Sequence, residues 1–400
     1  MNHPTKPGGF AGTPMNHPTK PGGFAGTPMN HPTKPGGFAG TPMNHATRPG
    51  GFAAPRGAGP LLEVDDLRTQ FLTGRGAVRA VDGVSFSLDR GRTLGVVGES
   101  GSGKTVLARS IMGLLPTTNV VRSGTVKYDG QKLTGLAPAE LREFWGAEIG
   151  MVFQDPMTSL NPVVRIGRQI TETMRFHLGI PDNEARARAV ELLRSVGIPD
   201  PERRVREYPH QLSGGMRQRV TIAIALACGP KLLLADEPTT ALDVTVQAQI
   251  LSLLGRQQRE RFMAMILVTH DLGVVAGRTD EIAVMYAGRI VEKAPTPVLF
   301  SDMKMRYTQA LFRSIPRVTD PGHKRLQAIG GRPPDLAAPA RGCSFAPRCP
   351  YAQQRCRDET PPLIEVGSGH AYACWYPVEA GEAEADLVTR RVAGDGVWAR

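Results

Sequence analysis

The sequence lacks any long hydrophobic run, and its start lacks the features of an export signal. Its longer apolar runs, such as 222–228 and 263–268, fall well short of the roughly 18–20 residues that a membrane-spanning helix needs. The N-terminus has no basic start, apolar stretch or small-residue cleavage site, which predicts an intracellular location. A chain of 400 residues, 40% of them hydrophobic, still has ample material for a large core and for two domains.

Acidic residues are missing from residues 1–60. That segment instead contributes basic side chains to the formal net charge of +11, namely Lys6, Lys20, Lys34, Arg48 and Arg56. The remaining basic residues are spread among acidic neighbours and form no cluster. The charge therefore does not predict a nucleic-acid-binding surface.

Residues 1–42 are three identical copies of MNHPTKPGGFAGTP, and an altered copy, MNHATRPGGFAAPR, follows at 43–56. Each copy is rich in Gly and Pro and offers a single aromatic side chain. Such a unit cannot bury enough apolar surface to offset the entropy lost on ordering. Residues 1–60 are therefore predicted to be a disordered tail.

From Leu61 the composition becomes typical of folded structure. The runs LLEVDDLRTQF and AVRAVDGVSFSL predict β-strands, and strands and helices then alternate. We expect strands at 93–97, 149–153, 232–235 and 266–269, and helices from Lys104, within about 164–198, from Gly214 and from Val244. This order is typical of an α/β fold with a parallel sheet and a helical insertion.

A phosphate-binding loop is predicted where GESGSGKT follows the apolar strand LGVV and precedes an apolar-periodic helix. The glycines allow backbone N–H groups to converge on phosphate oxygens at a helix N-terminus, Lys104 adds a charge to the β- and γ-phosphates, and Thr105 offers its hydroxyl to Mg²⁺. The candidate nucleotide-binding residues here are Gly98, Ser100, Gly101, Ser102, Gly103, Lys104 and Thr105.

Two adjacent carboxylates, Asp236 and Glu237, end the apolar strand in KLLLADEP. Ligands of α/β folds bind at strand ends. We expect Asp236 to hold Mg²⁺ and Glu237 to position or deprotonate an attacking water. The alternative is an acidic helix start before Thr239 and Thr240, which explains one carboxylate better than two.

Three further polar elements follow strands or open helices. Gln154 follows IGMVF and His270 follows MILVT, so both side chains should emerge at one edge of the sheet. The stretch LSGGMRQR by itself indicates only a helix N-terminus that could bind an anion. An isolated His at a strand end is more often a structural group than a catalytic one.

Together these segments resemble the nucleotide-binding subunits of ABC transporters, which carry GESGSGKT, FQDP, LSGGMRQR, LLLADEP, TALD and VTHD in this order. The resemblance covers about residues 61–300. It implies a P-loop NTPase with a RecA-like core, an antiparallel β region and a helical subdomain. Two such domains would close head to tail, so that Ser213 and Gly215 reach the γ-phosphate held on the partner's phosphate loop.

The same resemblance implies roles for the other polar residues. Gln154 would link Mg²⁺ and water to the membrane partner, His270 would sense the γ-phosphate, and Asp243 would lie on the dimer-contact loop. Phe71 falls where the family places an aromatic ring against adenine, a role that a core Phe on a strand could mimic. Because both Glu237 and His270 are present, we expect ATP hydrolysis.

Four of the five cysteines lie in the C-terminal region, at Cys343, Cys349, Cys356 and Cys374. Clustered thiols in an intracellular chain favour a metal centre over stable disulfides. The C-x-x-C spacing of paired zinc knuckles is absent, and His370 is near enough in sequence to substitute for a ligand.

The text GCSFAPRCPYAQQRC, then HAYACW, resembles the C-terminal extension of ATP-binding subunits from bacterial oligopeptide and dipeptide importers. In that family the four cysteines are associated with a [4Fe-4S] cluster, and zinc is the alternative here. Where the family usually has His-Pro-Tyr-Thr, this chain has Met305-Arg306-Tyr307-Thr308. We expect the ATP-binding domain at 61–300, the extension at 301–377 and a flexible end at 378–400.

The predicted function is ATP hydrolysis that energises oligopeptide or dipeptide import, at the cytoplasmic face of the cell membrane and as a peripheral subunit. The resemblance implies two transmembrane permeases, a second ATPase and an extracytoplasmic substrate-binding protein. It favours a heterodimer of ATPases over a homodimer, with no direct substrate contact and no nucleic acid. The alternatives are nickel or glutathione uptake, a soluble ABC ATPase acting on nucleic acid, and a regulatory protein that binds ATP with negligible hydrolysis.

Overall fold

The computed structural model describes residues 59–240, 242–315, 329–338, 340–367, 369–379 and 381. Regular structure begins at Leu62, close to the start predicted from the composition. The tail predicted for residues 1–60 and the flexible end predicted from 378 lie almost wholly outside the described residues.

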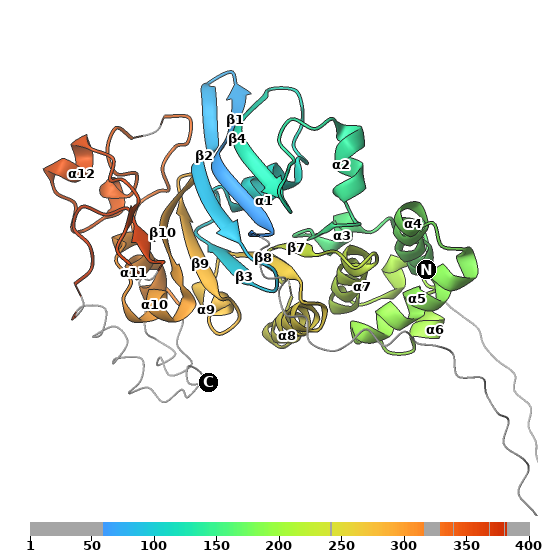
Figure 1. The fold of residues 1–400 in the computed structure, drawn as a ribbon. Coiled ribbons are helices and arrows are strands. Elements are labelled where there is room, and N and C mark those ends of the chain that lie inside the picture. The colour runs from blue at the N-terminus through green and yellow to red at the C-terminus, as the bar shows by residue number, and fades with distance from the viewer. Residues whose placement is uncertain are drawn as a thin grey trace, which may run out of the picture. The chain divides into compact units, whose positions relative to one another are not determined.

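The strands form two sheets (Figure 1). The smaller sheet is antiparallel, in the order β2-β1-β4-β5, and its strands are β1 (Leu62–Thr73), β2 (Gly76–Leu88), β4 (Val120–Tyr128) and β5 (Gln131–Lys132). The larger sheet has the order β11-β12-β10-β9-β3-β8-β7-β6. Its strands are β3 (Thr93–Val97), β6 (Ile149–Val152), β7 (Leu232–Asp236), β8 (Ala264–Thr269), β9 (Glu281–Tyr286), β10 (Arg289–Pro295), β11 (Ile364–Glu365) and β12 (Ala371–Tyr372).

Strands β9, β3, β8, β7 and β6 run parallel to one another, as the alternation of strands and helices predicts. Strand β8 shows why these strands are continuously apolar. Its Met265 and Leu267 pack in one hydrophobic cluster, and its Ala264, Ile266 and Val268 pack in another. Both faces of the strand are therefore buried, which explains the absence of polar alternation.

Helices pack against the sheets and also form a group on either side of the larger sheet (Figure 1). In chain order they are α1 (Lys104–Met112), α2 (Pro138–Phe144), α3 (Pro156–Ser159), α4 (Ile166–Leu178), α5 (Asp182–Ser195), α6 (Pro201–Arg204), η1 (Pro209–Gln211), α7 (Gly214–Leu226), α8 (Val244–Arg261), α9 (Leu272–Val275), α10 (Thr296–Ser301), α11 (Arg306–Arg313), η2 (Ala346–Arg348) and α12 (Gln354–Asp358). Helix α1 contacts β1 and β2 of the smaller sheet and β7 of the larger one. Helices α4–α6 lie beside α7, and α10–α12 lie on the β10 side of the larger sheet (Figure 1).

The C-terminal extension adds strand β12 to the larger sheet next to β10. Strand β12 pairs antiparallel with β10, and the N–H of Ala373 donates to the carbonyl of Val291 at 2.8 Å. The departure from the family pattern at Arg306 is accommodated, because its guanidinium lies 3.9 Å from the centre of the Tyr351 ring and donates to the carbonyls of Tyr376 and Pro377. Within the described ranges, no helix combines the length and the hydrophobicity needed to cross a membrane.

Candidate functional site

The predicted phosphate loop connects β3 to α1, and its glycines are required by close backbone approach. A Cβ atom on Gly98 would lie 2.2 Å from the carbonyl oxygen of Met285. A Cβ atom on Gly103 would lie 2.1 Å from the carbonyl oxygen of Ala80, and Gly103 also has a φ of +102°. Side chains at these positions would push the loop off the neighbouring strands, so the loop conformation depends on both glycines.

Lys104 is held inside this loop. Its Nζ donates to the carbonyl oxygens of Gly98 at 2.7 Å and Glu99 at 3.0 Å, and its side chain is only 4% exposed. Burial lowers the pKa of this ammonium. The charge is thus positioned by two neutral carbonyl groups, an arrangement that leaves it available to an anionic ligand.

Thr105 and Asp236 meet at the end of β7, where the Oγ1 of Thr105 donates to the Oδ1 of Asp236 at 3.0 Å. The other carboxylate oxygen, Oδ2, is buried without a hydrogen-bond partner, and so is the Oγ of Ser102 in the loop. Burial raises the pKa of the Asp236 carboxyl. Buried polar atoms are rarely left unpaired, so these two atoms fit a site completed by a ligand and a cation.

Glu237 is the hub of the polar residues at the sheet edge. Its Oε2 accepts from the Nε2 of Gln154 at 3.1 Å and from the Oγ1 of Thr240 at 3.0 Å, and its Oε1 lies 3.9 Å from the Nζ of Lys104. Its backbone has a φ of +45°, and its N–H donates to the carbonyl of Val268 on β8. A non-glycine residue in this left-handed conformation is uncommon and costs about 1–3 kcal/mol, which the surrounding contacts offset.

His270 completes this group. Its Nδ1 lies 3.3 Å from the Oε2 of Glu237, and the imidazole remains 59% exposed. The ends of β6, β7 and β8 therefore bring Gln154, Glu237 and His270 together, as expected for the carboxyl ends of neighbouring parallel strands.

Ser213 and Gly215 lie apart from this group in their described contacts. The Oγ of Ser213 accepts from the N–H of Met216 as the N-cap of α7, and Gly215 packs close to Val246 of α8. Asp243 caps α8 in the same way, through the N–H of Val246 at 2.9 Å. Within one chain, Ser213 and Asp243 are therefore the N-caps of α7 and α8.

Phe71 lies on β1 of the smaller sheet, where it pairs with Val78 of β2 and Val120 of β4. The side chain is half-buried.

Two contacts in the site were not predicted from the sequence. Thr240, which donates to Glu237, follows it by three residues in DEPTT and could have been found from that spacing. The carboxylate of Glu99, within the phosphate loop, pairs with Arg348 of the extension. No local signal marks that contact, because the two residues are far apart in the sequence.

The four C-terminal cysteines, Cys343, Cys349, Cys356 and Cys374, all line one small cavity. Burial raises the pKa of Cys343 to about 11 and also raises the pKa of Cys349 and Cys374. Across the described residues, no group of three or more His, Cys, Asp or Glu side chains is placed to hold a metal ion.

His370 does not join the cysteines. It is buried against β10, with its Nε2 2.9 Å from the Oε1 of Glu292. His370 is not among the residues that line the cavity of the four cysteines, so its described contacts do not support a role as a substitute metal ligand.

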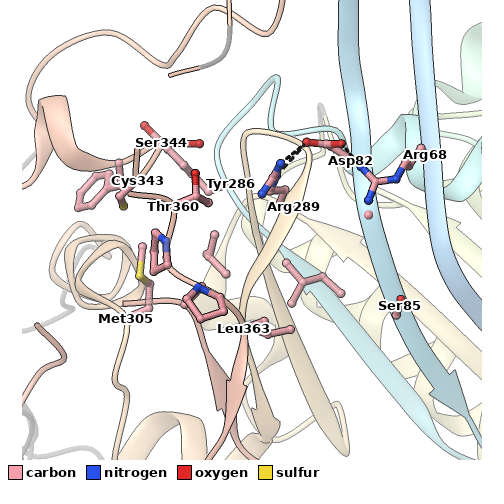
Figure 2. Close-up of a pocket in the computed structure, with 17 residues that line it drawn as sticks. Arg68, Asp82, Ser85, Tyr286, Arg289, Met305, Cys343, Ser344, Thr360 and Leu363 are labelled. Carbon is pink, nitrogen blue, oxygen red and sulfur yellow. Dashed lines mark hydrogen bonds and ion pairs between the residues drawn. The ribbon is translucent and has the colours of Figure 1, made fainter. Parts of the chain in front are cut away.

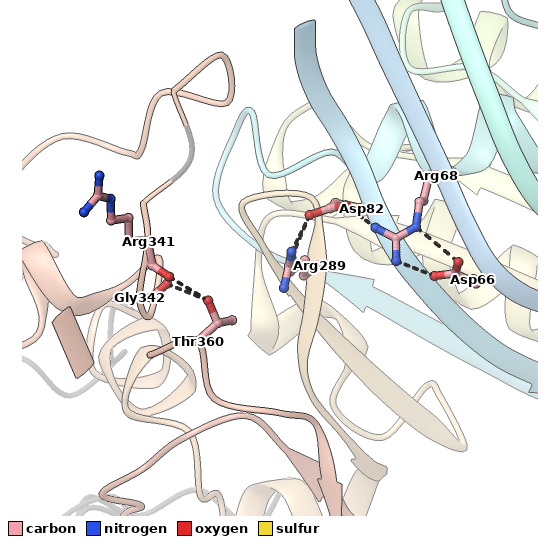
Figure 3. A network of polar contacts seen from close by, with 7 residues as sticks. All are labelled: Asp66, Arg68, Asp82, Arg289, Arg341, Gly342 and Thr360. Atoms are coloured by element: carbon pink, nitrogen blue, oxygen red, sulfur yellow. Dashed lines mark hydrogen bonds and ion pairs between the residues drawn. The ribbon is translucent and has the colours of Figure 1, made fainter. Parts of the chain in front are cut away.

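A separate cavity of about 550 Å³ lies between β2, β10 and the extension (Figure 2). Asp82 accepts from Arg68 at 2.7 Å and from Arg289 at 2.6 Å, and on the other side Thr360 donates to the carbonyls of Arg341 and Gly342 (Figure 3). Arg68, Asp82, Arg289 and Thr360 of its lining are therefore already engaged in hydrogen bonds. None of its lining residues belongs to the phosphate loop, so this cavity is distinct from the predicted nucleotide site.

Two family descriptions match the chain. "ABC transporter" matches residues 81–240, and "Oligopeptide/dipeptide transporter, C-terminal region" matches residues 291–356. The second match includes three of the four clustered cysteines and ends before Cys374.

Full-length relatives agree with these matches. The oligopeptide transport ATP-binding protein OppD of Bacillus subtilis is 50% identical over 316 residues, which are 79% of this chain and 88% of that protein. The dipeptide transport ATP-binding protein DppD of Escherichia coli is 47% identical over 319 residues, which are 80% of this chain and 97% of that protein. Among solved structures, the dimeric ATP-binding cassette MJ0796, bound to ADP and Pi in a post-hydrolysis state, is 30% identical with a TM-score of 0.53 and covers 59% of this chain and 98% of that chain.

Proposed function

This chain belongs to the ATP-binding subunits of oligopeptide and dipeptide ABC transporters, and from that membership we infer that it is the ATPase that energises a peptide importer. Within the structure, the observation that carries this inference is the convergence of Lys104, Gln154 and His270 on the carboxylate of Glu237. Nickel uptake, glutathione uptake and action on nucleic acid are not favoured.

The transporter also contains transmembrane permeases, a second ATPase and a substrate-binding protein. We propose that this subunit is peripheral, at the cytoplasmic face of the membrane, and meets a permease through the segment from Gln154 to Pro162. This proposal is supported by the exposure of two apolar side chains, Met157 within the segment at 62% and Val163 directly after it at 79%. We also propose the boundaries 61–300 for the ATP-binding domain and 301–377 for the extension.

We propose that the phosphate loop from Gly98 to Thr105 binds the ATP phosphates, with backbone N–H groups and Lys104 as donors. Mg²⁺ would be held by Thr105, Asp236 and Gln154 and would neutralise charge that develops on the phosphates. The unpaired Oδ2 of Asp236 supports this assignment. Phe71 would stack on adenine.

Glu237 is the proposed general base. Its carboxylate would orient a water molecule in line with the γ-phosphorus and accept a proton from it as the new P–O bond forms, while the bond to the ADP oxygen breaks. His270 would contact the γ-phosphate, and its 59% exposure leaves room for it to turn from Glu237 to that ligand. The residues of the second ATPase that correspond to Ser213 and Gly215 would complete the site from across the dimer interface, because a helix N-terminus such as that of α7 favours an anionic ligand.

For the extension we propose a [4Fe-4S] cluster on the four clustered cysteines. Their common cavity supports this, because four thiolates are the usual ligands of such a cluster. Zinc on the same four cysteines is the alternative. Burial raises the pKa values of Cys343, Cys349 and Cys374, so binding of a cationic centre would favour the loss of these thiol protons.

The cluster proposal predicts about four iron and four acid-labile sulfide ions per chain after anaerobic purification. Cys356→Ser should lower both, together with the visible absorbance. Cys228→Ser is the matched control, because Cys228 lies beside the end of α7 and does not line the cavity. One zinc per chain and no visible absorbance would contradict the cluster.

The importer function is tested by purifying the Glu237→Gln variant from membranes in the presence of ATP and identifying every chain that accompanies it. Slowed hydrolysis should hold the closed dimer, so two multi-span permeases and a second ATPase should be recovered. Addition of the substrate-binding protein with peptide should stimulate ATP hydrolysis by the wild-type assembly. Recovery of nucleic acid or soluble chains alone would overturn the transporter and leave the ATPase chemistry standing.

A further inference from the structure

Glu99 connects the phosphate loop to the C-terminal extension through its N–H and its carboxylate, while its carbonyl contacts the loop itself. Its carbonyl oxygen accepts from the Nζ of Lys104 at 3.0 Å, and its N–H donates to the hydroxyl of Tyr307 at 2.9 Å. Its carboxylate accepts two hydrogen bonds from Arg348, at 2.6 and 2.8 Å. One residue of the loop is therefore fixed by α11 and η2 while it helps to hold the lysine.

Arg348 is built into the protein rather than displayed on its surface. Its side chain is 3% exposed, and beyond Glu99 it donates to the hydroxyl of Tyr286 and to the carbonyls of Ile329 and Gly330. These contacts use all five guanidinium donors. A planar guanidinium that binds both carboxylate oxygens fixes the orientation of the Glu99 carboxylate as well as its distance. A flexible ammonium group would fix only the distance.

The aromatic residues around this pair make it rigid. The Tyr307 ring is fully buried, with its centre 4.4 Å from that of Tyr286 and 5.3 Å from that of Phe345. Tyr286 ends β9, which is the parallel neighbour of β3, the strand that leads into the phosphate loop. The aromatic cluster of Tyr286, Tyr307 and Phe345 thus packs the extension against the strand next to the one that leads into the phosphate loop.

We propose that Arg348 is a positioning residue for ATP hydrolysis, which holds the Glu99 carboxylate away from the nucleotide phosphates and fixes the carbonyl on which Lys104 depends. It does not touch the nucleotide. Without Arg348, an uncompensated carboxylate would remain within the phosphate loop and would repel the anionic ligand. This proposal rests on the ATPase activity assigned above and does not depend on the cargo.

The effect should appear mainly in nucleotide affinity. In the assembled transporter, Arg348→Met is expected to raise the KM for ATP by about 2- to 30-fold, with a smaller change in kcat. Arg348→Lys keeps the charge but loses the two-pronged contact, and should raise the KM less. Adding Glu99→Gln to Arg348→Met removes the unpaired carboxylate and should lower the KM again toward the wild-type value.

A matched control lies in the same extension. Arg355 precedes Cys356 as Arg348 precedes Cys349, but it is half-exposed and pairs with Glu359 away from the loop. Arg355→Met should leave the KM for ATP unchanged. If Arg348→Met fails to fold, Tyr307→Phe removes only the hydroxyl that accepts from Glu99 and should still raise the KM.

Melting temperature is measured beside the kinetics for every variant. An unchanged KM in Arg348→Met, or in both Arg348→Lys and Tyr307→Phe, would show a purely structural bridge and overturn the proposal, even if the melting temperature falls. Absence of ATP hydrolysis in the wild-type assembly would instead contradict the proposed function, so the two failures are distinguishable.

Discussion

Replacing Glu237 with Gln is expected to lower ATP hydrolysis at its site by about 10²–10⁴-fold, the range for loss of a general base. The amide keeps the shape of the carboxylate and its place beside Gln154 and Thr240. It cannot accept the proton of the attacking water. ATP binding should persist, because Lys104 and the phosphate loop are unchanged.

The measurement is single-turnover hydrolysis of labelled ATP by the assembled transporter. If the second ATPase is a related chain with its own intact site, one of the two bound nucleotides should remain ATP. If it is a second copy, both should. Glu184→Gln is the control, since Glu184 forms a surface pair with Arg188 on α5 and should leave the rate unchanged. Normal hydrolysis in Glu237→Gln would assign the base to another residue.

Much of the fold could be predicted because its signals are local. Ser213 and Asp243 are side chains that accept from backbone N–H groups at helix starts, and α7 and α8 begin directly after them. The apolar runs before Gly98 and Glu237 became buried parallel strands, which require side chains that tolerate burial on both faces. The convergence at Glu237 followed from one rule, that parallel strands end at the same edge.

The remaining features depend on contacts that local patterns do not encode. Arg348 and Glu99 are 249 positions apart, and nothing in the intervening sequence states which acid the arginine will meet. His370 lies near Cys374 in sequence, yet it pairs with Glu292 across the β10 edge. The proposed role of Ser213 depends on a contact with a second ATPase chain. Neither one sequence nor one subunit contains that contact.

The second large effect is expected at Lys104. Hydrogen bonds to charged groups contribute about 1.5–3 kcal/mol each, so Lys104→Ala should weaken ATP binding by about 10- to 150-fold. The loop itself should keep its path, because its close approaches involve Gly98 and Gly103 rather than the lysine stem. The Lys104→Ala variant should therefore still fold, although most of its affinity for ATP is lost.

Equilibrium binding of labelled ATP with Mg²⁺ measures this loss, and the melting temperature without nucleotide checks the fold. Lys132→Ala is the control, because Lys132 is exposed on the short strand β5. Stabilisation of the wild type by ATP should also disappear in Lys104→Ala, since a ligand stabilises a protein only in proportion to its binding. Undiminished ATP affinity in Lys104→Ala would show that the buried ammonium serves the loop carbonyls alone, and the phosphate site would have to lie elsewhere.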